Sequence, residues 1–191
     1  MSYPHWEYFL SIEADLASCA RYVEFHDDNF ATYSVEFARV IIASGAEFDV
    51  VAKRLCARID PAAKTPERIN EYYSIITAKY PKFVDHVVHI PRFKMEVKPW
   101  QSWTLDSAPH WWSKGYNKIK HERDTHFREA NLENAIYSTA GLLLGIIYLY
   151  DALYDKVPKI EMSAAPKLLD PLDYPGARPR PSSWWTARAW K

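Results

Sequence analysis

The residues best suited to chemistry lie together in the segment YNKIKHERDTHF, from Tyr116 to Phe127. On an α-helix, Lys114, Asn117 and His121 are three and four residues apart and therefore share one face. Lys118 fits the same spacing in place of Asn117. The imidazole of His121 titrates near neutral pH, so it can exchange a proton with an attacking 2′-hydroxyl or a leaving oxygen. A nearby ammonium group can stabilise the charge that grows on the phosphorus oxygens, so the pattern fits metal-independent phosphodiester cleavage.

The same spacing also occurs on the solvated, lysine-rich face of an ordinary helix. Short motifs match by chance in many unrelated sequences. At the level of spacing, the chemical interpretation and the plain surface interpretation therefore both stay open.

Histidines and carboxylates elsewhere do not have the spacing of a metal site. His121-Glu122 with His126 is one residue longer than the zinc-protease motif HExxH, so a helix would turn the two imidazoles apart. His86 and His89 lie in a segment that we predict to be extended, where residues three apart point to opposite faces. We therefore expect no metal and no other cofactor, although a site assembled from distant residues stays open.

Other reactive side chains give weaker signals. Cys19 and Cys56 lie in apolar helical patterns without a neighbouring histidine, which is typical of structural thiols. His5, His26 and His110 have no obvious partners. The sequence has no GxSxG motif, glycine-rich phosphate loop or dinucleotide fingerprint, which counts against α/β-hydrolases and nucleotide-dependent kinases.

Apolar periodicity and proline positions predict the elements that must position these residues. A first helix begins near Pro4 and is broken by Asp27-Asp28-Asn29. A long amphipathic helix follows and ends at Asp60-Pro61. A short helix then starts at Thr65-Pro66 and stops before Pro81.

Residues 81–108 differ from the helical segments in composition. From His86 this stretch is rich in β-branched and aromatic residues and is interrupted by prolines, which predicts an extended insertion or an edge hairpin. Helix resumes from Pro109 to about Arg123, breaks at Asp124-Thr125, and continues in a last helix from about Glu129 to Tyr154. The centre of this last helix is apolar on every side, so we expect it to be the most buried element.

The chain of 191 residues, 48% of them hydrophobic, is sufficient for one core. We predict an all-α domain over residues 1–157, a bundle of four to five helices with the insertion at 81–108. Residues 158–191 form a proline-rich, tryptophan-rich C-terminal arm that is extended.

Charge and hydropathy indicate the setting of the protein. The 24 basic and 24 acidic residues balance, so any polyanion site has to be a local patch. The most apolar run, Ala135–Tyr150, is shorter than the ~20 residues of a membrane span. The first residues lack a signal-peptide pattern, and the cysteines fit a reducing compartment. We expect a soluble, cytoplasmic protein without membrane contact.

Two tryptophan pairs could stack on nucleic-acid bases or pack internally. We expect Trp111-Trp112 to anchor its helix in the core. Trp184-Trp185 has Arg178, Arg180 and Arg188 nearby, so it could stack on bases, pack in a groove of its own domain or bind a protein partner.

The segment that begins at Trp111 and runs to Tyr150 resembles the C-terminal half of HEPN domains, which are nucleotide-binding helical bundles of prokaryotes and higher eukaryotes. The similarity consists of a polar residue, three further positions and a histidine, here Asn117 to His121, followed by a short break and a long apolar helix. It covers residues 109–154.

In that family an arginine, separated from the histidine by four to six intervening residues, completes an RNA-cleaving pair at a dimer interface. No arginine lies in that window here, and the nearest cation at that separation is Lys114. A lysine supplies charge without the planar, two-pronged grip of a guanidinium group.

The resemblance implies a metal-independent endoribonuclease of a toxin–antitoxin or phage-defence system. His121 would be the general acid or base, Lys114 would stabilise the phosphorane, and Asn117 would orient the phosphate or the imidazole. The RNA phosphates would be bound by Lys118, Lys120 and Arg123. Two copies would face their motif helices across a two-fold axis and build one RNA groove as a homodimer.

The alternative is a non-catalytic helical subunit of such a system, which uses the same surface and the arm to bind another protein. The missing arginine favours this alternative, whereas the dense cluster of Asn, Lys, His and Arg residues favours the nuclease.

Overall fold

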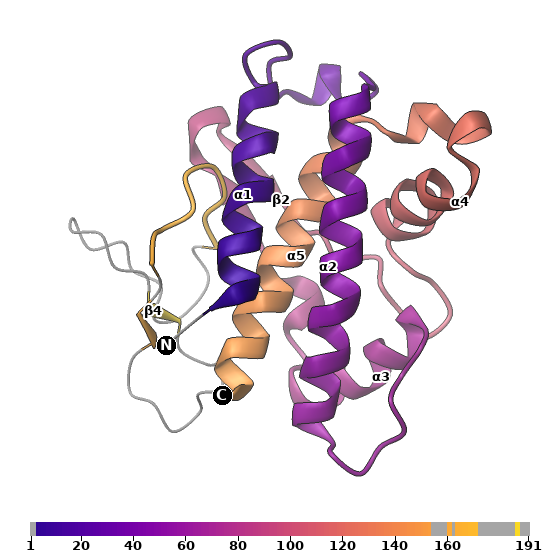
Figure 1. Ribbon diagram of the computed structural model, residues 1–191, viewed down its shortest axis with the longest axis vertical. Helices are drawn as coiled ribbons and strands as arrows, with labels where there is room; N and C mark the ends of the chain where they lie inside the picture. Colours follow the sequence, from indigo (N-terminus) through magenta and orange to yellow (C-terminus); the bar gives the residue numbers. More distant parts are fainter. Residues whose placement is uncertain (1–2, 154–159, 162, 172–185, 188–191) are drawn as a thin grey trace.

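The computed structural model describes residues 3–153, 160–161, 163–171 and 186–187 (Figure 1). The described residues form five α-helices: α1 (Pro4–Cys19), α2 (Val35–Ile59), α3 (Ile69–Lys79), α4 (Asn117–His126) and α5 (Leu132–Leu153). A π-helical turn, η4 (Trp111–Tyr116), leads directly into α4. Short 3₁₀ turns lie at η1 (Asp27–Asn29), η2 (Phe83–Asp85), η3 (Pro91–Phe93) and η5 (Phe127–Glu129). The predicted all-α class is confirmed.

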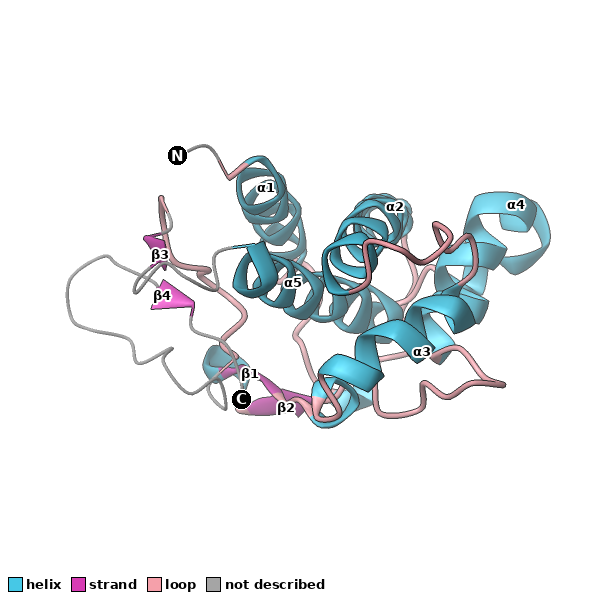
Figure 2. Ribbon diagram, turned by 90° about the horizontal axis from the view of Figure 1, so that it is seen from below, coloured by secondary structure: helices cyan, strands magenta, loops and turns pink. Residues whose placement is uncertain are grey.

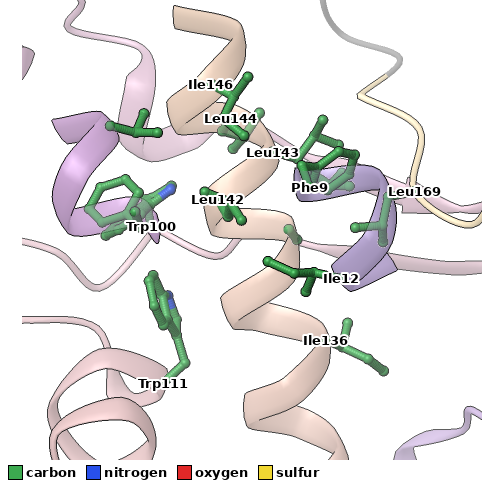
Figure 3. Close-up of a cluster of buried hydrophobic side chains, with 14 of the residues drawn as sticks. Phe9, Ile12, Trp100, Trp111, Ile136, Leu142, Leu143, Leu144, Ile146 and Leu169 are labelled. Atoms are coloured by element: carbon green, nitrogen blue, oxygen red, sulfur yellow. The ribbon is translucent and has the colours of Figure 1, made fainter. Parts of the chain in front are cut away.

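The helix α5 lies at the centre of the bundle, with α1 and α2 beside it (Figure 2). Every residue from Ser138 to Asp151 is buried, which confirms that its apolar centre is the most buried element. In Figure 3, Trp100 lies on one side of α5, and Phe9 and Leu169 lie on the other. A helix without a polar face is stable in water only when neighbours cover all of its sides.

The helices α2 and α5 pack closely because small residues line their contact. Gly145 of α5 faces the Phe48 ring, and a Cβ atom added at Gly145 would lie 2.9 Å from that ring. Ser44 and Thr139 face each other across the same contact, with 3.3 Å between their hydroxyl oxygens. These buried hydroxyls satisfy each other, so the contact carries polar atoms without leaving them unpaired.

A cluster of tryptophans packs against the side of α5 that faces η4. The rings of Trp100 and Trp111 lie 4.9 Å apart, edge to face. Trp111 donates its indole N–H to the Pro99 carbonyl at 2.8 Å, and Trp100 donates to the Gly141 carbonyl at 3.2 Å. Trp111 and Trp112 are both buried, so the prediction that this pair anchors its helix in the core is confirmed.

The predicted extended insertion contains an antiparallel hairpin of β1 (Val88–Ile90) and β2 (Met95–Val97), paired from Val88↔Val97 to Ile90↔Met95. Lys94, just before β2, has a left-handed backbone with φ 53°, as tight turns require. The two-residue strands β3 (Ile160–Glu161) and β4 (Thr186–Ala187) also pair antiparallel.

Residues 163–171 of the predicted arm pack on the bundle. The buried Glu13 side chain of α1 holds this stretch, accepting hydrogen bonds of 2.9 Å from the backbone N–H groups of Lys167, Leu168 and Leu169. The next residue, Asp170, exchanges two backbone hydrogen bonds with His89 of β1. A charged acceptor makes such bonds stronger than neutral ones, so this carboxylate anchors the stretch.

Several predictions for the chain end lie outside the described residues. These are the domain boundary after residue 157, the end of the last helix at Tyr154, and the role of Trp184 and Trp185.

Two predicted helix boundaries in the first half of the chain are wrong. The first helix ends at Cys19 rather than before Asp27, and the chain then brings Phe25 into the core, where its ring stacks on Phe93 at 4.9 Å. The third helix begins at Ile69 rather than at Thr65-Pro66.

The later start of α3 has a local cause. The Glu71 carboxylate accepts hydrogen bonds from the backbone N–H groups of Glu67 at 2.7 Å and Arg68 at 3.3 Å. These are amides that the start of a helix leaves without partners, so the side chain of Glu71 fixes the first turn.

The helix α5 is long and apolar enough to cross a membrane, but 89% of its most apolar stretch is buried inside the bundle. The core helix of a soluble protein has this burial, whereas a membrane span would present apolar residues to lipid.

The contact of η4 with α2 predicts the effect of Gly45→Ala. A methyl group at Gly45 would overlap the base of the Tyr116 ring, which is buried and has no room to move away. Overpacking of this kind lowers the free energy of unfolding by about 1–3 kcal/mol, as measured by urea denaturation. Ala46→Ser on the exposed neighbouring position is the control. Stabilisation by Gly45→Ala, the usual effect of alanine in a helix, would contradict this packing.

The anchor on α1 predicts the effect of Glu13→Gln. The neutral amide has one acceptor oxygen in place of two charged ones, so it cannot accept all three backbone hydrogen bonds. We therefore expect the free energy of unfolding to fall by about 1–3 kcal/mol. Hydrogen exchange should speed up at the amides of Lys167, Leu168 and Leu169 before it does in α5. Asp15→Asn, on an exposed position of α1, should change neither quantity, and unchanged exchange in Glu13→Gln would refute the anchor.

Candidate functional site

The predicted motif lies along η4 and α4, on the outer edge of the bundle (Figure 1). Trp112, Tyr116 and Ile119 are buried, whereas Lys114 and His121 are exposed. We use the name α4 ridge for the six predicted site residues of this segment, all of them exposed or partly exposed: Lys114, Asn117, Lys118, Lys120, His121 and Arg123.

The predicted alignment of Lys114, Asn117 and His121 assumes a regular α-helix, but the first part of this segment is a π-helical turn. In η4 the N–H of Asn117 bonds to the Trp112 carbonyl, five residues earlier. The wider turn lets two neighbouring pairs, 111–112 and 115–116, all face the core. It also changes the angle between residues before and after it, so Lys114 and His121 do not stand in strict α-helical register. Such π turns are frequent at functional sites.

The helix α4 is kinked directly after His121. Glu122 has φ −140° and ψ 40°, so the predicted break at Asp124-Thr125 is wrong by two residues. The Thr125 hydroxyl donates to the Glu122 carbonyl at 3.1 Å and satisfies an oxygen at the kink. Arg123 therefore belongs to the second half of α4, beyond the kink.

The start of α5 is also shifted, from the predicted Glu129 to Leu132. The side chain of Asn131 accepts a hydrogen bond of 2.9 Å from the N–H of Asn134. An asparagine in this position caps a helix, so the helix begins after it.

Glu122 forms ion pairs with two neighbouring side chains of α4. Its carboxylate binds Lys118 at 2.9 and 3.0 Å and His126 at 3.1 Å. The hydrogen bond from Lys118 is the main cause that lowers the pKa of Glu122. Lys120 lies over the Tyr116 ring, 5.2 Å from its centre, and donates to its hydroxyl. The contacts of Glu122 are solvent-exposed, so each is weak and can be exchanged for a ligand.

The other ridge residues are unpaired. Within the described ranges, no hydrogen bond or ion pair is made by the side chains of Lys114, Asn117, His121 and Arg123. The segment 110–128 carries five Lys or Arg residues against two Asp or Glu residues, a net charge of +3 without the histidines. This is a local positive patch on a chain without net charge, as a polyanion site requires.

A cleft of about 330 Å³ lies beside the start of η4. We call it the His110 cleft. Three segments supply its walls: the loop after β2, the residues before η4 and the first turns of α5. Its polar lining consists of Lys98, Gln101, His110, Glu133, Asn134 and Tyr137, together with Ser102.

A buried amide fixes the orientation and tautomer of His110. Asn134 is buried and donates its side-chain N–H groups to the Glu129 backbone carbonyl at 2.9 Å and to the Glu129 carboxylate at 3.3 Å. Its side-chain oxygen therefore faces Nδ1 of His110, at 3.3 Å. Because this oxygen can only accept, Nδ1 carries the proton and Nε2 keeps its lone pair when the ring is neutral.

The sequence offers no obvious partner for His110, but the structure supplies two. The Glu129 carboxylate lies 3.9 Å from its Nε2 and would pair with the protonated ring. Its partner Asn134 is 24 residues away in the chain. No local spacing could have indicated this group of three residues.

Two other histidines without an obvious partner in the sequence also have partners in the structure. His5 of α1 lies between two residues of α2, with Nδ1 at 2.5 Å from Glu47 and Nε2 at 2.7 Å from Arg54. Arg54 can only donate, so Nδ1 carries the proton that goes to Glu47. His26 accepts the backbone N–H of Asp28 at 3.2 Å.

The HxxH pair does not converge. His86 is buried and bonds to the Tyr148 hydroxyl at 2.8 Å, whereas His89 lies 3.2 Å from the Glu96 carboxylate on the neighbouring strand. In the part of the chain that the structure describes, no three His, Cys, Asp or Glu side chains gather as metal ligands would.

Comparisons of the chain with models of protein families, with curated proteins and with solved structures found no match. The resemblance to HEPN domains therefore stays a prediction based on residues 109–154.

Burial of the cysteines predicts that neither acts as a nucleophile. Both are buried, and burial raises the pKa of Cys56 to about 12 and also raises the pKa of Cys19. At a pH of about 8 the thiolate fraction of Cys56 is very small, so iodoacetamide should leave it unmodified for hours in the native protein. Mass spectrometry should find both cysteines alkylated after unfolding in urea. Complete alkylation of native Cys56 within minutes would contradict this environment.

Proposed function

We propose that the protein is a metal-independent endoribonuclease of HEPN type, and that the α4 ridge is its active surface. The main support is the contrast between two histidines of α4. The exposed ring of His126 is bound to Glu122, whereas the exposed ring of His121 has no partner within the described residues. Lys114 and Asn117 of the same segment are also unpaired among the described residues, and an unpaired imidazole is suited to proton transfer.

In the proposed reaction, Nε2 or Nδ1 of His121 takes the proton of a ribose 2′-hydroxyl. The resulting oxygen attacks the adjacent phosphorus, and the bond from phosphorus to the 5′-oxygen breaks. The protonated His121 then gives a proton to the leaving 5′-oxygen and returns to its neutral form, so the products are a 2′,3′-cyclic phosphate and a 5′-hydroxyl end. The ammonium group of Lys114 stabilises the charge on the phosphorane oxygens, and Asn117 orients the phosphate.

The ridge would bind RNA through its positive charge. Arg123 and Lys120 would contact phosphates, and Lys118 would do so by exchanging its weak pair with Glu122 for a phosphate. Two copies that face their α4 helices across a two-fold axis would form one RNA groove. A cytoplasmic role in a toxin–antitoxin or phage-defence system follows from the family resemblance alone.

The second candidate is a non-catalytic subunit that binds another protein through the same ridge. Two observations favour it: the missing arginine in the window before His121, and the Glu122 carboxylate, which neutralises part of the ridge.

The test compares variants of the two histidines of α4 in RNA cleavage with excess chelator. His121→Ala removes the general base and should slow cleavage about 10²–10⁴-fold. His126→Ala is the matched control, since it removes an exposed imidazole of the same helix that Glu122 already binds, and it should cleave within a few fold of the wild-type rate. Equal loss in both variants, or no cleavage by the wild-type chain, would leave the non-catalytic candidate.

Two further variants test the cation. Lys114→Ala should slow cleavage about 10²–10³-fold, the usual effect of removing one stabilising group. Lys114→Arg should keep or raise the rate, because guanidinium binds phosphate oxygens with two parallel hydrogen bonds. A 2′-deoxyribose at the cleaved position should prevent cleavage altogether, and cleavage of that substrate would contradict attack by the 2′-hydroxyl.

A further inference from the structure

The His110 cleft lies on the same segment as the α4 ridge. His110 precedes η4 directly and lies eleven residues before His121, which corresponds to roughly 16 Å along a helix axis. An extended RNA strand that crosses the ridge would therefore reach the cleft a few nucleotides away from the cleaved bond. The cleft volume of about 330 Å³ is near the lower end of ligand pockets, which suits one base and part of its ribose.

The side chains that line the cleft divide into fixed and available groups. The amide of Asn134 is fully used, because it donates to Glu129 and accepts from His110. By contrast, in the described part of the chain, the side chains of Lys98, Gln101 and Glu133 make no hydrogen bond or ion pair. Among its available groups, a ligand therefore meets two side chains that can donate, from the loop after β2, and one acceptor-only carboxylate from α5. The hydroxyls of Ser102 and Tyr137 also line the cleft.

The carboxylate lies beside the aromatic wall of the cleft. Tyr137 is one turn after Glu133 on α5, and burial, together with the charge of Glu133, raises the pKa of Tyr137. Its ring is half-buried, and the buried Pro99 and Pro109 add apolar surface to the cleft. Flat aromatic and apolar surfaces are the usual stacking platform for an unstacked RNA base.

We infer that the His110 cleft binds one unstacked guanine base of the RNA, with Glu133 as the residue that selects it. This inference rests on the proposed function, because it takes RNA as the substrate. Guanine presents two adjacent donors, N1–H and the N2 amino group, which one carboxylate accepts together. Its neighbouring O6 is an acceptor that Lys98 or Gln101 can donate to.

The other bases do not fit this pattern. Adenine, cytosine and uracil each place an acceptor next to a donor on the same edge, so one oxygen of Glu133 would face a lone pair. An unpaired polar group in a cleft costs free energy, and that cost excludes the wrong base.

The test measures binding separately from cleavage. The full chain carrying His121→Ala, which is expected not to cleave, is titrated against a fluorescent oligouridine that contains a single guanosine. Inosine in place of guanosine removes only the N2 amino group and should weaken binding about tenfold, and adenosine should weaken it at least as much. Fluorescence anisotropy gives the dissociation constants.

Two carboxylate variants in the same background identify the selecting residue. Glu133→Gln should bring guanosine and inosine oligonucleotides to equal affinity within about twofold, because the amide cannot accept both donors. Asp124→Asn removes the same charge from an exposed position near the ridge and should keep the tenfold difference. The side chain of Glu133 has no internal bond among the described residues, and circular dichroism checks that its variant is folded.

The outcomes separate the two proposals. Equal affinity for guanosine and inosine, a preference that survives Glu133→Gln, or no binding of any oligonucleotide each overturns guanine recognition. Guanosine preference with no cleavage by the wild-type chain overturns the nuclease and keeps the cleft as an RNA-binding site. Cleavage by the wild-type chain without guanosine preference keeps the nuclease proposal and overturns guanine recognition by the cleft.

Discussion

Burial of α5 on all of its sides is the constraint on which the rest of the structure depends. A helix without a polar face has to be covered everywhere, and the chain covers it with different elements on different sides. The helices α1 and α2 pack beside it, and α2 approaches closely at Gly145. The tryptophans around Trp100 seal a further side, and Leu169 of the C-terminal stretch lies next to Phe9 (Figure 3).

This covering also determines where the candidate site lies. Trp111, Trp112 and Tyr116 seal the core and at the same time belong to η4, so the first part of the motif segment is held by buried aromatic rings. Beyond Ile119 the segment has no buried residue, and α4 is kinked at Glu122. His110 is therefore attached to a rigid start, whereas His121 lies at the exposed end, where partners and ligands can reach it.

Much of the fold could be predicted from the sequence, because apolar periodicity and proline positions reflect local rules. The long α2, the buried α5, the hairpin and the core position of Trp111-Trp112 follow from such patterns. The boundaries that failed depend on single side chains, such as the Glu71 carboxylate that starts α3. The π turn could not be foreseen either, because its cause is the packing of neighbouring pairs against distant helices. The contacts of His110 could not be predicted from local spacing, because its partners Glu129 and Asn134 lie about twenty residues later in the chain.

The most direct test of the central claim, that η4, α4 and the adjoining start of α5 form an RNA-binding face, is hydrogen exchange with and without bound RNA. The chain carrying His121→Ala would be saturated with a guanosine-containing oligonucleotide and compared with the unbound chain by mass spectrometry. Exchange should slow in peptides covering residues 98–126 and the first turns of α5, and should stay unchanged in α1 and α3. Slowing confined to α1 or α3, or no change anywhere at saturating RNA, would contradict the claim.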